Sequence, residues 1–431
     1  MASYQSPSVV PHILFGMFVL EILFLFIKKI DGTLYGVFDT FEKLYPIIAI
    51  VLLTSFMRPK LNRYWWAALL FYSAYLVYGV LISLANQKSM HIILVQTYHE
   101  MKFFPMLFLY STVRCDNRWS KTTLKLIKPL IIITVLLIIF QLGAPGPYDA
   151  IFKNGGHFEK GHIGGMLLPR AVGWFWHPGQ IALFFLITAV FTIVEYKKRT
   201  IRFGVSMLLL CILFVVLPIQ RFELFILFNV LLLLWMRRYL GFNYKPLLAC
   251  IVLCSFGGGF LYIISDEALF WVLLEDFQSP RNVFLVESLF TLVESNYWGA
   301  GWGTIGSHAA ADVAKVYEYN AMKDIWWVKL GQYFYDTYWP HVIGETGIPG
   351  FFLLLLSMVF MIMALEQPQS SILLFVLILT SALSSNAQSL YHLCVFGWFI
   401  LLLENAHNQP VAISRRNSSA IPSTNLVGVR A

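Results

Sequence analysis

The chain has 431 residues and a net charge of +8, yet only 13% of its residues are charged, whereas 58% are apolar and the mean hydropathy is +0.69. A soluble globular protein is about a quarter charged, so this composition disfavours a soluble domain, a disordered chain, a secreted disulfide scaffold and a nucleic-acid-binding protein. We therefore predict an all-α polytopic membrane protein. The five cysteines show neither a disulfide framework nor a metal-ligand spacing.

Long apolar runs divide the chain into candidate membrane spans. A helix needs about 20 mostly apolar residues to cross the hydrocarbon core, and the chain holds about twelve such runs. The first run has no charged segment before it and no small-residue cleavage site after it, which favours a retained span over a signal peptide. The candidate spans are 10–27, 35–57, 64–85, 91–113, 125–143, 179–196, 203–219, 222–236, 246–265, 341–365, 371–387 and 389–404.

Basic residues orient these spans, because cytoplasmic connections are enriched in lysine and arginine. In a twelve-span order, four basic connections fall on one side together with Arg415 and Arg416, so we predict that this side is cytoplasmic. Lys28 and Lys29 fall on the other side and violate the rule. The membrane domain is then 1–404, and 405–431 is predicted to be a disordered cytoplasmic tail. The basic connections are 58–63, 114–128, 197–202 and 237–245.

Two long connections fall on the outward side, at 144–178 and 266–340. Loops of this length in a compact protein are usually functional. The second contains the aromatic stretch DVAKVYEYNAMKDIWWVKLGQYFYDTYW. Two interpretations stay open for it: an interfacial helix with tryptophan and tyrosine at headgroup level, or a platform on which sugar rings stack.

Three arginines lie on or near the outward face: Arg170 in PRAVGWFWHPGQ, Arg221 in LPIQRFELF and Arg281 in SPRNVFLVESLF. Each is either a snorkelling anchor or part of an anion site. Arg221 favours the second alternative, because a tight turn between two apolar helices seldom needs an arginine. Guanidinium groups offer bidentate donors that never deprotonate, so the three together predict a phosphate-binding site.

A His–Glu pair opens the span that follows Pro340. His341 and Glu345 are four residues apart and share one face of a helix. An ionisable pair at the mouth of a membrane helix is suited to proton transfer with a substrate hydroxyl. The alternative is an interfacial pair whose two side chains only hydrogen-bond to each other. The order differs from HExxH and no third ligand follows, so we predict no metal.

Other polar groups are weaker candidates. In TYHEMKFF, His99, Glu100 and Lys102 lie within a predicted span, where buried charges are usually paired or functional. Glu100 and Lys102 are not on one helical face, so they do not pair with each other. The segment GAGWGTIG (299–306) lacks the Lys-Ser/Thr of a phosphate loop, and its glycines are expected to allow a sharp turn.

In this order, these segments resemble the bacterial O-antigen ligase and polymerase (Wzy-type) superfamily over roughly residues 165 to 365. RAVGWFWHPGQIALFF is similar to that family's Arg, Gly, aromatic, His/Asn-Pro-Asn segment, and PIQRFELFIL to its Ser-Arg-Gly turn. SPRNVFLVESLFTLVESNYWGAGWGTIGS resembles its loop arginine with a Pro-Leu-x-Gly-x-Gly stretch, and HVIGETGIPGFF its Glu-x-Gly-x-x-Gly pattern. The chain departs from the family at Gly179, Gln220, Phe222 and Tyr297–Trp298.

The resemblance implies a GT-C-like, O-antigen ligase-type fold and a multi-pass enzyme of the bacterial inner membrane that acts at the periplasmic face. It implies an undecaprenyl-diphosphate-linked oligosaccharide as substrate, with no nucleotide sugar, cofactor or metal needed. By position, Arg170, Arg221 and Arg281 would bind the diphosphate, while His341, helped by Glu345, would be the base that acts on the acceptor hydroxyl.

We prefer a polymerase of O-antigen, capsule or exopolysaccharide repeat units to a ligase that transfers glycan to lipid A-core, although the motifs are shared by both. A partner that controls chain length is left open. A transporter or flippase of lipid-linked sugars is a competing class, but transporters often show a repeat between halves, and the large outward loop occurs once. A membrane scaffold would give no reason for outward arginines.

Overall fold

The computed structural model describes the protein over most of the predicted spans and over parts of the two loops predicted to face outward. The described residues are 9–30, 40–56, 61–116, 118–152, 160–163, 166–169, 171–175, 178–197, 204–216, 227–233, 244–258, 280–319, 321–329, 334, 338–383 and 390–405. The predicted tail, apart from Asn405, lies outside them.

The described part of the chain is helical except for one short hairpin, which confirms the helical fold class. The long helices are α1 (Val9–Ile30), α4 (Arg63–Ala85), α7 (Arg118–Gly143), α9 (Pro178–Lys197) and α18 (Trp339–Ala364). Shorter ones are α3 (Tyr45–Phe56), α5 (Met90–Glu100), α6 (Phe103–Thr112), α8 (Pro145–Phe152), α10 (Gly204–Val216), α12 (Tyr244–Val252), α15 (Pro280–Glu294), α16 (Val316–Tyr319), α17 (Trp326–Lys329), α19 (Pro368–Leu383) and α20 (Leu390–Asn405). The remaining elements are the π-helices η1 (Leu253–Gly258) and η2 (Ala309–Val313), the 3-10 helix η3 (Ala321–Asp324), and the antiparallel strands β1 (Lys160–Ile163) and β2 (Met166–Pro169).

Several helices have the length and composition of membrane spans. In the described part, Val9–Ile27, Arg63–Ala85, Arg118–Gly143 and Trp339–Ala364 are long and apolar enough to cross a bilayer, and three shorter apolar helices accompany them. The pattern of α4 fits a lipid environment. Its outer face exposes Leu70, Val77 and Leu81, whereas its buried face carries Tyr72 and Tyr75. A water-soluble helix would turn these faces the other way.

The predicted span 91–113 is two helices. Helix α5 ends at Glu100 and α6 begins at Phe103, with a turn at Met101 and Lys102 between them. Irregular backbone inside a membrane bundle is tolerated only where protein groups or water satisfy it. The break therefore places His99, Glu100 and Lys102 where other elements can bond to them.

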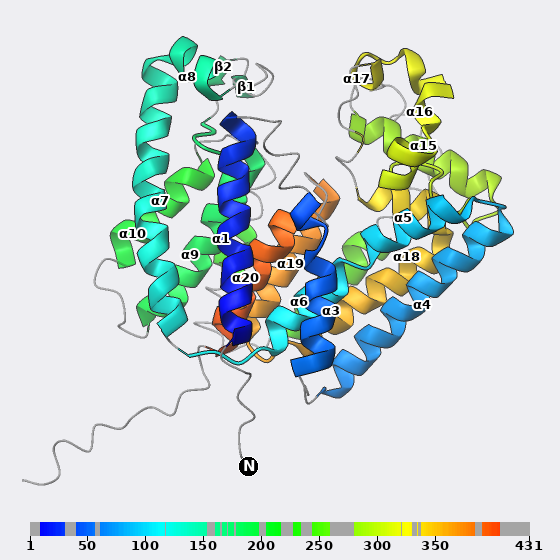
Figure 1. Ribbon diagram of the computed structural model, residues 1–431, viewed down its shortest axis with the longest axis horizontal. Helices are drawn as coiled ribbons and strands as arrows, with labels where there is room; N and C mark the ends of the chain where they lie inside the picture. Colours follow the sequence, from blue (N-terminus) through cyan, green and yellow to red (C-terminus); the bar gives the residue numbers. More distant parts are fainter. Residues whose placement is uncertain are drawn as a thin grey trace, which may run out of the picture.

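The described parts of the two loops predicted to face outward lie at the same end of the molecule. Helix α8 and the β1–β2 hairpin come from the first loop, and α15, α16 and α17 from the second; both groups lie at the top in Figure 1. Helices α4 and α18 run side by side beneath the second group, with α15 packed on α18. Loop residues are thereby collected at the end where His341 opens α18.

Polar contacts close the opposite end of the bundle. The Glu404 carboxylate accepts hydrogen bonds from the backbone N–H groups of Glu366 and Gln367, both at 3.0 Å. The Asn405 amide donates to the Val113 carbonyl at 2.8 Å and accepts from the Cys115 N–H at 3.1 Å. These bonds tie the ends of α6, α18 and α20 together. Residues 113–115 are at the junction between the predicted span 91–113 and a connection predicted to be cytoplasmic, and they lie beside the start of the predicted tail.

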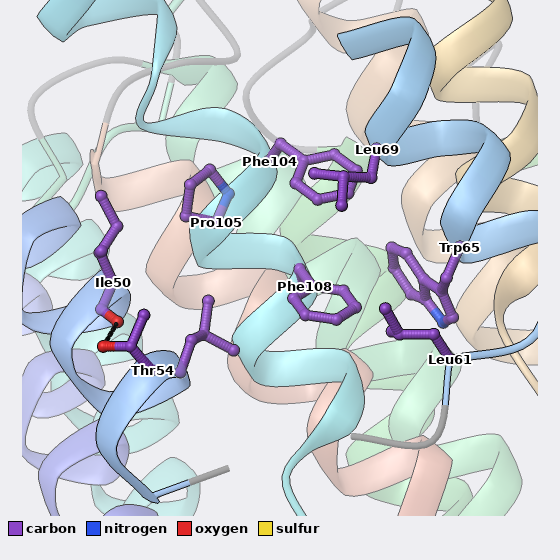
Figure 2. Close-up of a pocket in the computed structure, with 9 residues that line it drawn as sticks. Ile50, Thr54, Leu61, Trp65, Leu69, Phe104, Pro105 and Phe108 are labelled. Carbon is purple, nitrogen blue, oxygen red and sulfur yellow. Dashed lines mark hydrogen bonds between the residues drawn. The ribbon is translucent and has the colours of Figure 1, made fainter. Parts of the chain in front are cut away.

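An apolar pocket of about 190 Å³ lies between α3, α4 and α6 (Figure 2). Its walls include Ile50, Trp65, Phe104 and Phe108. The one hydroxyl in its lining, that of Thr54, bonds to the Ile50 carbonyl of its own helix at 2.9 Å. The pocket therefore suits a hydrocarbon group and has no chemistry of its own.

Candidate functional site

A break in α18 shapes the candidate site. Gly347 has φ 64° and ψ −166°, so the helix is interrupted there. The glycine-rich segment 299–306 fills the interruption: the N–H groups of Ala300 and Gly301 donate to the carbonyls of Gly344 and Glu345, at 3.0 and 2.9 Å. In return, the Ile348 N–H donates to the Tyr297 carbonyl at 3.0 Å. The loop thus replaces the bonds that the kinked helix lacks.

The expected sharp turning of this segment is confirmed, because Gly299, Gly301, Gly303 and Gly306 all have positive φ. Its Trp302 ring lies against α4 at Gly79, where a Cβ would meet the ring at 2.2 Å. The backbone N–H of Trp302 donates to the Ser83 hydroxyl at 2.8 Å. The segment is consequently fixed between α4 and α18.

Glu100 is the centre of a buried polar cluster. Its side chain is fully buried and accepts four side-chain hydrogen bonds. Oε2 accepts from the hydroxyls of Tyr75 and Tyr338, both at 3.1 Å. Oε1 accepts from Gln96 Nε2 at 2.7 Å and contacts His341 Nε2 at 3.0 Å. Because these neighbours are donors, the cluster suits an ionised carboxylate.

This environment sets the tautomer of His341. The ring is almost completely buried, and with a carboxylate at Nε2 the proton belongs on that nitrogen. Nδ1 is then the nitrogen whose lone pair can accept a proton. A carboxylate that holds one ring nitrogen also stabilises the imidazolium that forms when the other is protonated. The dyad can therefore act as a general base.

Glu345 has a different partner from the predicted one. Its Oε1 accepts from the N–H groups of Thr304 and Ile305, at 2.9 and 3.1 Å, and from the Ser307 hydroxyl at 2.6 Å. His341 and Glu345 do share one helix, but the carboxylate bonded to the histidine is Glu100. Glu345 instead holds the glycine-rich segment in place. Its Oε2 is buried without a hydrogen-bond partner and can accept a hydrogen bond from a hydroxyl group.

Basic groups surround the break between α5 and α6. The rings of His99 and His308 stack with centroids 4.0 Å apart and an interplanar angle of 7°. Lys102 Nζ lies 2.9 Å from His99 Nδ1, and His308 Nδ1 lies 3.7 Å from the Asp312 carboxylate. Burial lowers the pKa of His308, and the nearby Asp312 opposes the shift.

Of the three arginines predicted to bind phosphate, the structure describes the position of Arg281. Arg170 and Arg221 lie outside the described residues. Arg281 lies in the first turn of α15, seven residues before Ser288, whose Cα is next to Gly344 of α18. At 1.5 Å per residue, its backbone lies roughly 10 Å along α15 from that contact. Arg281 is thus on the helix that packs against the His341 segment.

The aromatic stretch of the second loop is not one helix. It is divided among η2, α16, η3 and α17. Tyr317, Trp327 and Phe334 pack with Phe284 of α15 in a small separate core. These rings build the loop, whereas the predicted interpretations had placed them at the headgroup level or against sugar.

Sequence reasoning did not assign Tyr75, Gln96, Ser307 or Tyr338 to the site. They come from different elements, and no motif relates them. The one available signal was the charged group His99–Glu100–Lys102 inside an apolar run. Within the described residues, no group of three histidine, cysteine or acidic side chains is placed to hold a metal.

No protein-family model, curated protein or solved structure matches the chain. The function proposed below therefore draws on the chemistry of this chain's own residues and on the motif resemblance.

The Ser307–Glu345 bond gives a test of this geometry. Ser307→Ala removes a hydroxyl that donates to the buried Glu345 at 2.6 Å, so we expect a loss of about 1–3 kcal/mol of stability. Ser288→Ala is the matched control, since that buried hydroxyl bonds to the Phe284 carbonyl of its own helix. Unfolding in mixed detergent–SDS micelles measures both. Equal effects of the two substitutions would contradict the anchoring role of Glu345.

Proposed function

We propose that the protein is a membrane glycosyltransferase that uses a polyprenyl-diphosphate-linked donor. More specifically, we propose a polysaccharide polymerase that transfers undecaprenyl-diphosphate-linked glycan onto the next lipid-linked repeat unit at the periplasmic face of the inner membrane. The observation that supports this most is the buried His341–Glu100 pair, which opens α18 beneath the second outward loop.

The proposed step needs a base and a leaving group. The acceptor hydroxyl oxygen attacks the anomeric carbon of the donor, and its proton passes to His341 Nδ1. The bond between the anomeric carbon and the diphosphate oxygen breaks, and the diphosphate leaves with the electron pair. Glu100 stabilises the resulting imidazolium through Nε2. Glu345 Oε2, buried and unpartnered, accepts a hydrogen bond that orients the acceptor.

The diphosphate itself requires positive groups. Charge develops on its oxygens as the bond breaks, so donors arranged around it lower the barrier. We assign this role to Arg170, Arg221 and Arg281, as the motif resemblance implies. The place of Arg281 on α15, which packs on α18, supports the assignment for that residue. Outward-loop residues would then hold the sugar.

Deletion of the gene in its host tests the proposal, with surface polysaccharide separated on a gel. A polymerase predicts that the ladder collapses to core plus one repeat unit, and that His341→Ala and Arg221→Ala genes fail to restore it. Bare core with polymer left on the lipid carrier would identify a ligase. A normal ladder would contradict both activities and favour the transport of lipid-linked sugars.

A further inference from the structure

A second group of buried polar side chains lies inside the helix bundle, separate from the His341 site. It forms where α1 packs on α20, α20 on α6, and α6 on α3. Each of these side chains is less than a tenth exposed. The members are Glu21, Glu42, Tyr45, Tyr110, Tyr391 and Cys394.

These groups converge on Glu21. Glu21 interacts electrostatically with Glu42, and Tyr45 interacts with both carboxyls. Tyr391 interacts with Glu21 from α20. Tyr110 and Cys394 complete the surroundings, because they interact with each other and with Glu21. Polar groups from α1, α6, α20 and the segment that begins α3 therefore share one apolar interior.

Four oxygen atoms in this group are buried without a hydrogen-bond partner: Glu21 Oε1, Tyr45 Oη, Tyr110 Oη and Tyr391 Oη. An ionised carboxylate in a membrane interior requires donors or a counter-charge. Glu404 illustrates the difference, because it is equally buried and both of its oxygens accept backbone N–H bonds. Glu21 lacks this compensation at Oε1. The neutral acid, which can donate its own O–H, suits this site better.

We propose that Glu21 and Glu42 form an intramembrane proton-binding site, in which one proton is shared by the two carboxyl groups beside the hydroxyls of Tyr45 and Tyr391. Ionising both of two buried carboxyls that interact electrostatically is costly in a low-dielectric site. A proton also fits better than a divalent cation, since no three acidic, histidine or cysteine ligands meet within the described residues. The site is independent of the glycosyltransferase proposal.

Labelling with dicyclohexylcarbodiimide tests the site, because this apolar reagent modifies protonated carboxyls within membranes. The full chain would be purified, reconstituted in lipid nanodiscs at pH 7, treated, digested and mapped by mass spectrometry. We expect the adduct in the Glu21–Glu42 pair and none on Glu404. Glu21→Gln should lower the labelling at least about tenfold. An adduct at neither Glu21 nor Glu42 would overturn the proposal.

Thermal unfolding of the same samples gives a second measurement. Glutamine resembles a protonated carboxyl, so Glu21→Gln should leave the melting temperature within about 2 °C of wild type. Glu404→Gln should lower it by more, because an amide nitrogen would replace one acceptor of the two N–H bonds. If Glu21→Gln lowers the melting temperature as much as Glu404→Gln does, Glu21 is ionised and the proposal is wrong.

Discussion

Gly347→Ala is expected to prevent stable folding of the α18 region. The residue has φ 64° and ψ −166°, a combination that essentially only glycine adopts, at a cost of about 1–3 kcal/mol for other residues. A Cβ would also lie 2.4 Å from the Trp298 carbonyl carbon and 2.5 Å from the Tyr297 oxygen. Both are backbone atoms and cannot rotate away. The total loss should exceed about 4 kcal/mol.

The measurement is unfolding in mixed detergent–SDS micelles, with the yield of monodisperse protein as a second readout. Gly16→Ala in α1 is the control, because no atom lies within 4 Å of its Cβ position and its φ is ordinary. That substitution should change stability by no more than about 1 kcal/mol. A Gly347→Ala protein as stable as the control would show that the loop and helix can separate without loss.

The helical elements were largely predictable because bilayer crossing imposes a strong pattern. Twenty apolar residues in a row leave few alternatives, and α1, α4 and α18 begin and end within a few residues of their predicted spans. The break between α5 and α6 was not predicted. Its signal was present in His99, Glu100 and Lys102, since three ionisable residues inside an apolar run need partners that a straight lipid-facing helix cannot supply.

The hydrogen-bond partners of His341 and Glu345 could not be predicted from the sequence. His341 and Glu345 are four residues apart, so helical periodicity placed them on one face, but periodicity carries no information about other elements. Glu100 is 241 residues from His341 along the chain. It reaches the histidine only because α4 and α18 pack together with α5 beside them. The same packing places Glu345 where the backbone of the glycine-rich segment donates hydrogen bonds to it. The sharp turning of that segment was predicted, but its contact with Glu345 was not.

Packing also explains why the aromatic stretch was interpreted too simply. Its composition is that of an interfacial helix, and tryptophan and tyrosine are common at headgroup level. Tyr317 and Trp327 are nevertheless buried against Phe284. A connection of this size needs a hydrophobic core of its own, and aromatic residues form most of that core. Composition alone does not distinguish the two uses.

If the His341–Glu100 pair is the base of the proposed reaction, its removal should have the largest effect on activity. A positioned general base contributes about 10²–10⁴-fold to a rate, so His341→Ala should lower the polymerisation rate by about that factor. Glu100→Gln removes the charge that holds the tautomer and stabilises the imidazolium. We expect it to lower the rate about 10²-fold or more, with the protein still folded.

Initial rates in proteoliposomes supplied with lipid-linked repeat units would measure both variants. His91→Ala is the matched control, since this exposed histidine lies on the same helix as Glu100 and its loss should leave the rate unchanged. Substitutions of two residues that act as one unit do not have additive effects on the activation free energy. The double variant should therefore be no slower than His341→Ala alone. Multiplied losses in the double variant would instead mean that Glu100 acts on the reaction separately from His341.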